Sequence, residues 1–68
     1  MEGQYTGTYI GKEICGFKQN HVYTFETFNN GRHYELTAIY DHTLNEETDL
    51  YITYSNEVSI RRNWSIEE

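Results

Sequence analysis

The segment from Val22 to Tyr40 constrains the fold of this chain more strongly than any other. Two runs rich in β-branched and aromatic residues, V-Y-T-F-E-T-F at 22–28 and R-H-Y-E-L-T-A-I-Y at 32–40, flank the triplet Asn-Asn-Gly at 29–31. Such runs are typical of β-strands. Glycine, and less readily asparagine, adopts the positive φ of a tight hairpin turn. The segment therefore predicts an antiparallel β-hairpin around which the other strands pack.

Alternation along the hairpin predicts which of its faces enters the core. Successive side chains in a strand point to opposite faces of the sheet. A shift of the pairing by one residue would bury Glu26 and Glu35, so the register is well specified. The more apolar face consists of Tyr23, Phe25, Leu36 and Ala38, with Tyr34 as a further candidate.

Shorter patterns on either side of the hairpin predict three more strands. Residues 5–10, 49–54 and 58–61 alternate in polarity, with a 3₁₀ turn expected at Ser55-Asn56. Residues 41–48 are polar and read as a loop, and no useful stretch has a helical period. The loop 11–20 should fold back and place its apolar side chains, Ile14, Cys15 and Phe17, against the core.

These elements predict an all-β fold, a small five-stranded SH3-like barrel. Sixty-eight residues allow one domain, residues 1–68, with an ordered core at about 4–66 and fraying at Glu67 and Glu68. The one cysteine forms no intramolecular disulfide. The stability must therefore come from packing, chiefly of the aromatic residues that make up 16% of the chain, or from association with a partner.

Four short motifs resemble small SH3-like proteins encoded by phages and prophages of Gram-positive bacteria. They are Y-I-G-K at 9–12, G-F-K at 16–18, V-Y-T-F at 22–25 and Y-S-N-E-V-S-I at 54–60. The resemblance spans residues 5–62 and implies a fold and an origin, because most of these proteins have no assigned function. The chain has no proline and no A-L-Y-D-Y-like run. Recognition of proline-rich ligands, as in peptide-binding SH3 domains, is therefore not implied.

The charge balance argues for a basic protein partner and against nucleic acid. Eleven acidic and five basic residues give a formal net charge of −6 and a pI of about 4.9. Binding to phosphates normally requires the opposite balance. No secretory signal is visible at residues 1–4, and no apolar run is long enough for a membrane span. We expect a cytoplasmic, soluble protein with no membrane partner.

The candidate binding residues combine tyrosines with acidic side chains. Tyr51 should face solvent or a partner, because its neighbours Leu50 and Ile52 point to the opposite face. Tyrosine is enriched at protein interfaces, and carboxylates steer basic partners. The alternative is that the tyrosines pack in the sheet and the carboxylates are merely solvated. The predicted partner-binding residues are Tyr51, Glu46, Glu47, Asp49, Tyr40 and Tyr54.

These observations predict a non-catalytic protein-binding module, encoded by a phage or prophage, that docks on a host or phage protein. Two other functions are alternatives to it. The first is a nucleic-acid-binding barrel that uses Arg61 and Arg62 and stacks a base on Trp64, although packing of Trp64 against the barrel mouth is the favoured interpretation. The second is a self-associating structural component, a homo-oligomer paired through an exposed edge strand. We expect no enzyme, cofactor or metal, because a barrel of this size has little room for a pocket. The possible ligands His21, His33, His42 and Cys15 match no zinc spacing.

Overall fold

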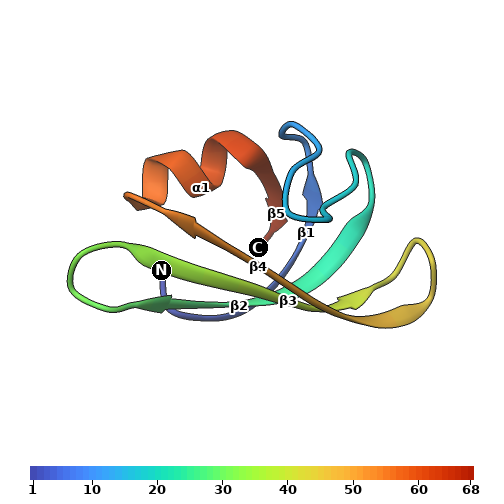
Figure 1. The fold of residues 1–68 in the computed structure, drawn as a ribbon, viewed down its shortest axis with the longest axis horizontal. Coiled ribbons are helices and arrows are strands. Elements are labelled where there is room, and N and C mark those ends of the chain that lie inside the picture. Colours follow the sequence, from blue (N-terminus) through green and yellow to red (C-terminus); the bar gives the residue numbers. More distant parts are fainter.

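Five antiparallel strands form one sheet in the computed structural model, which describes residues 1–68 (Figure 1). The spatial order of the strands is β4-β3-β2-β1-β5, and a short helix precedes the last strand. The predicted all-β class is confirmed. In chain order the elements are β1 (Gly3–Tyr9), β2 (Val22–Asn29), β3 (Tyr34–Asp41), β4 (Glu46–Tyr54), α1 (Glu57–Asn63) and β5 (Trp64–Glu67).

The central hairpin forms as predicted. Strands β2 and β3 pair from Asn29 and Tyr34 at the turn to Tyr23 and Asp41 at the open end. Gly31 occupies the turn at φ 96°, a conformation that glycine adopts without steric cost. The Asn30 side-chain oxygen accepts hydrogen bonds from the backbone amides of Arg32 and His33, at 3.0 and 3.1 Å. These local bonds hold the turn and so fix the register of the sheet.

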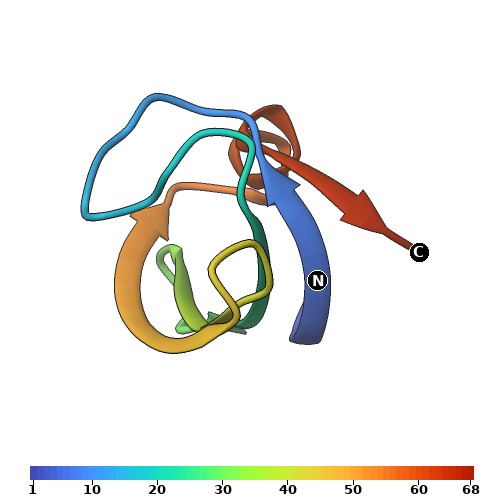
Figure 2. The same ribbon diagram turned by 90° about the vertical axis from the view of Figure 1, so that its right-hand side faces the viewer.

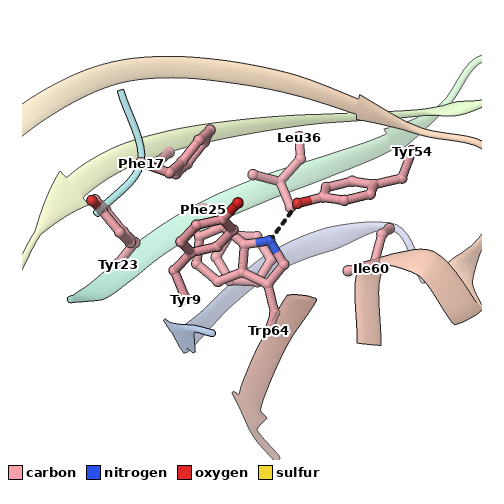
Figure 3. Packing of buried hydrophobic residues seen from close by; sticks show 9 residues of the cluster. Tyr9, Phe17, Tyr23, Phe25, Leu36, Tyr54, Ile60 and Trp64 are labelled. Atoms are coloured by element: carbon pink, nitrogen blue, oxygen red, sulfur yellow. Dashed lines mark hydrogen bonds between the residues drawn. The ribbon is translucent and has the colours of Figure 1, made fainter. Parts of the chain in front are cut away.

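The core is aromatic and centres on Trp64 (Figure 3). The indole ring lies 4.5 Å from the ring of Phe25 and 5.0 Å from that of Tyr9, measured between centroids. Four predicted hairpin residues are buried, whereas Tyr34 is only half-buried. The buried cluster comprises Tyr9, Phe17, Tyr23, Phe25, Leu36, Ala38, Tyr54, Ile60 and Trp64.

The sheet curls around this core without closing (Figure 2). Strand β4 pairs only with β3, and β5 pairs only with β1. Irregularities in the pairing of β3 with both neighbours bend the sheet near Ala38. The two edge strands therefore remain unpaired with each other, and the hydrogen-bonded closure of a barrel is absent.

The prediction of a strand at 58–61 is wrong, because these residues form α1. Asn56 caps the helix by accepting a hydrogen bond from the Ser59 amide at 2.9 Å. Glu57 and Arg61 pair across one turn at 3.0 Å. The last strand is instead Trp64–Glu67, so Glu67 pairs with β1 rather than fraying.

Two predicted loops also differ from the structure. The connection after β3 is only the turn 42–45, and β4 begins at Glu46 rather than 49. Buried Asp41 explains the short turn, because its carboxylate accepts hydrogen bonds from the amides of Thr43 and Leu44. In the first loop only Phe17 is buried, whereas Ile14 and Cys15 are exposed. No helix has the length and apolar character needed to cross a membrane.

Candidate protein-binding face

One face of the β2-β3-β4 segment packs on the core, and the opposite face carries polar and aromatic side chains. We call this the outer face. The register aligns Glu26 with Thr37 and Tyr51 across the three strands, and Phe28 with Glu35 and Thr53. The outer face consists of Thr24, Glu26 and Phe28 from β2, Glu35, Thr37 and Tyr40 from β3, and Glu47, Asp49, Tyr51 and Thr53 from β4.

The outer face is acidic and contains no lysine or arginine. Its four carboxylates are Glu26, Glu35, Glu47 and Asp49. Of these only Glu35 lies within 4 Å of a basic side chain, His33 at 3.9 Å. The basic residues lie elsewhere, in the first loop, the hairpin turn and α1: Lys12, Lys18, Arg32, Arg61 and Arg62. This separation gives the face a negative field that attracts a cationic surface.

Two large aromatic side chains are exposed on the outer face. Phe28 is 58% exposed and Tyr51 is 50% exposed. Glu35 lies directly opposite Phe28 on one side and diagonal to Tyr51 on the other. Partial burial, and then the negative charge of Glu35, raise the pKa of the Tyr51 hydroxyl. Tyr51 therefore stays neutral near physiological pH, with both a donor and an acceptor available.

Tyr40 lies at the end of the outer face, where side-chain contacts hold it. Its hydroxyl donates a hydrogen bond to the Asn45 side chain. Its ring makes an edge contact with His42 at 4.9 Å between centroids. The His42 Nε2 lies 2.7 Å from the Thr24 hydroxyl oxygen. Tyr40 therefore contributes a half-buried, fixed ring rather than a freely exposed one.

The structure brings together four of the six predicted partner-binding residues. Tyr51, Glu47, Asp49 and Tyr40 share the outer face. Glu46 is exposed at the first position of β4, next to that face.

Tyr54, the sixth residue, belongs to the core instead. It is 8% exposed, and its hydroxyl accepts a hydrogen bond from the Trp64 indole nitrogen at 3.0 Å (Figure 3). The prediction that Tyr54 lies on the binding surface is therefore wrong. The alternation that places Leu50 and Ile52 inward also places Tyr54 inward.

The sequence analysis missed the other charged and aromatic members of the outer face: Glu26, Phe28 and Glu35. The alternation that placed Phe25 in the core also placed Glu26 and Phe28 on the opposite side of β2. The tight turn fixed the register that sets Phe28 against Glu35. The signal was therefore present, but it required the residues of three strands to be combined on one face.

The alternative nucleic-acid cluster is not assembled on the surface. Trp64 is 2% exposed, so its ring is not accessible for stacking on a base. The Arg61 guanidinium is paired with Glu57 at 3.0 Å and with Glu68 at 2.7 Å. Arg62 is exposed and has no carboxylate partner.

The histidines lie apart, each in a separate contact. His21 Nδ1 lies 2.9 Å from Asp41, His33 Nε2 lies 3.0 Å from the Asn30 amide, and His42 contacts Thr24. No group of three metal-ligating side chains comes together, and no pocket opens on the surface.

No protein-family model matches the chain, and no curated protein or solved structure matches it significantly. The chemistry of its own residues is therefore the basis for inferring its function.

Proposed function

We propose that this chain is a non-catalytic protein-binding module that docks on a basic protein through its outer face. One observation carries the proposal: four carboxylates surround exposed aromatic rings on a sheet face that has no lysine or arginine. Aromatic side chains supply buried area at interfaces, and opposite charge speeds association and fixes orientation. Phe28 and Tyr51 are the anchors, and the carboxylates select the partner.

The proposal includes an open SH3-like arrangement and a phage or prophage origin. The long first loop, the tight central hairpin and the single short helix before β5 support the arrangement. The motif resemblance at residues 5–62 supports the origin. The partner is then a host or phage protein with a basic surface, and the binding takes place in the cytoplasm.

The test compares two triple variants that remove the same charge and one exposed hydrophobic side chain each. The first, Glu47→Gln/Asp49→Asn/Tyr51→Ala, changes the outer face. The second, Glu13→Gln/Glu67→Gln/Val58→Ala, changes exposed residues elsewhere. Each protein and the wild type is immobilised and exposed to a Gram-positive bacterial lysate, with nuclease added to half of each sample.

We expect a stoichiometric protein that is retained by the wild type and the control variant and lost from the outer-face variant, with or without nuclease. Equal retention by all three proteins would refute the assigned face. Loss of the captured material on nuclease treatment would favour nucleic-acid binding instead.

A further inference from the structure

Strand β4 leaves one side of its backbone unpaired. It is the edge strand next to β3, and its nine residues run from Glu46 to Tyr54. In an antiparallel pair, alternate residues point their amide and carbonyl groups away from the partner strand. None of the hydrogen bonds made by loops, turns or side chains ends on a backbone atom of β4. The outward groups of this edge are therefore available to another extended chain.

The side chains of β4 determine which chain can pair with it. Glu46, Glu47 and Asp49 occupy three of its first four positions, and Tyr51 and Thr53 are also exposed. Carboxylates on an edge strand disfavour pairing with another acidic strand, and oppositely charged cross-strand neighbours stabilise pairing. Pairing with β4 of a second copy of this chain would bring three more carboxylates to the contact between the two strands. A strand with lysine or arginine at alternate positions would neutralise them.

We infer that the partner adds a strand to the free edge of β4, using an extended segment with basic residues at alternate positions. This inference rests on the proposed function and names its binding mode. The main-chain bonds to β4 supply affinity, and the alternate basic side chains lie against Glu47, Asp49 and the ring of Tyr51 on the outer face. Strand addition of this kind takes its specificity from alternate side chains.

The probe is the acetylated, amidated octapeptide Lys-Val-Lys-Thr-Lys-Val-Lys-Thr, titrated into ¹⁵N-labelled full-length protein at fixed ionic strength. We expect saturable changes in NMR chemical shift that are largest for the β4 amides. We also expect slower hydrogen exchange of the β4 amides that point away from β3. Asp49→Lys should weaken binding about tenfold or more, because it replaces an attractive pair by a repulsive one. The matched variant Glu67→Lys, an equal charge change on β5, should bind like the wild type.

Two N-methylated versions of the same peptide separate strand addition from charge attraction. One carries N-methyl groups on its lysines and the other on its valines and threonines. In an added strand only one of these sets of amides faces β4. One version should therefore lose about tenfold or more in affinity, while the other binds like the parent peptide.

Equal binding of both methylated peptides would overturn strand addition, while the capture experiment would still decide the docking face. Absence of shifts with the parent peptide would also overturn it. If the NMR signals of the β4 amides broaden with protein concentration in the absence of peptide, the β4 edge pairs with a second copy of the chain instead. The peptide could add to β4 as expected while the outer-face triple variant still captures its partner. That result would refute the outer face as the docking surface for the captured protein, and strand addition of basic segments to β4 would stand.

Discussion

At the scale of single residues, the hydrogen bond between Trp64 and Tyr54 connects the two edge strands, β5 and β4. The indole nitrogen donates to the Tyr54 hydroxyl at 3.0 Å, and both side chains are buried. Burial raises the pKa of Tyr54 to about 12, so the hydroxyl stays neutral and remains an acceptor over the physiological range. Tyr54, which the sequence analysis placed on the binding surface, therefore stabilises the interior together with Trp64.

Tyr54→Phe should lower the free energy of unfolding by about 1–3 kcal/mol, because it leaves the buried indole N–H without an acceptor. Urea unfolding followed by the fluorescence of the single tryptophan measures this. Tyr51→Phe makes the same chemical change at an exposed position, and we expect it to stay within about 0.5 kcal/mol of the wild type. Equal stability of the two variants would refute the role of the bond.

At the scale of elements, the β3-β4 turn depends on the buried carboxylate of Asp41. Burial raises the pKa of Asp41, but hydrogen bonds from His21, Leu44 and Thr43 more than offset this, so its pKa lies below the ordinary 3.8. The folded state therefore binds this proton less tightly than the unfolded state does. The resulting stabilisation is complete above the unfolded pKa and is lost as the pH falls through the folded one.

Asp41→Asn should therefore destabilise the protein by about 1.5–3 kcal/mol at pH 6, because hydrogen bonds to a charged group are lost. The difference from the wild type should shrink as the pH falls below 3.8. Urea unfolding at pH 6, 4.5 and 3 measures both effects. Glu67→Gln, at an exposed carboxylate on β5 without a hydrogen bond, serves as the control. A difference that does not change with pH would show that the carboxylate charge is not responsible.

The elements differ in how far the sequence could predict them. The β2-β3 hairpin was predictable because β-propensity, alternation and the glycine turn all agree over nearly twenty residues. Helix α1 was not, because V-S-I-R alternates in polarity and a seven-residue helix buries only Ile60. Its signal was the cap, Asn56 followed by Glu57. The short β3-β4 turn was missed because its stability comes from Asp41, whose burial is a tertiary effect.

At the scale of the whole molecule, charge is distributed unevenly over the curled sheet. The outer face combines four carboxylates from three neighbouring strands, while the lysines and arginines lie in the loops and the helix. The sequence alone predicts the net charge of −6 and shows three carboxylates close together at 46–49, but it placed Glu46 and Glu47 in a loop rather than on β4. The combined face also depends on the register of β4 against β3, which the sequence did not predict because the short turn 42–45 was read as a longer loop.

This concentration of charge should destabilise the unbound protein. Like charges on adjacent positions of a sheet repel, and salt screens exposed charges over about 10 Å at 0.1 M. Glu47→Gln/Asp49→Asn should therefore raise the free energy of unfolding by a few tenths of a kcal/mol, up to about 1, in 10 mM salt. The gain should disappear near 0.5 M sodium chloride. Urea unfolding at both salt concentrations measures it.

The control is Glu13→Gln/Glu67→Gln, which removes the same charge from residues outside the outer face. If it stabilises the protein equally, net charge rather than the clustering of carboxylates is responsible. If only the outer-face variant gains stability while it also loses the captured partner, the repulsion between these carboxylates is relieved by binding. The free energy that destabilises the isolated sheet then contributes to its affinity for a basic surface, because a cationic partner removes the same repulsion.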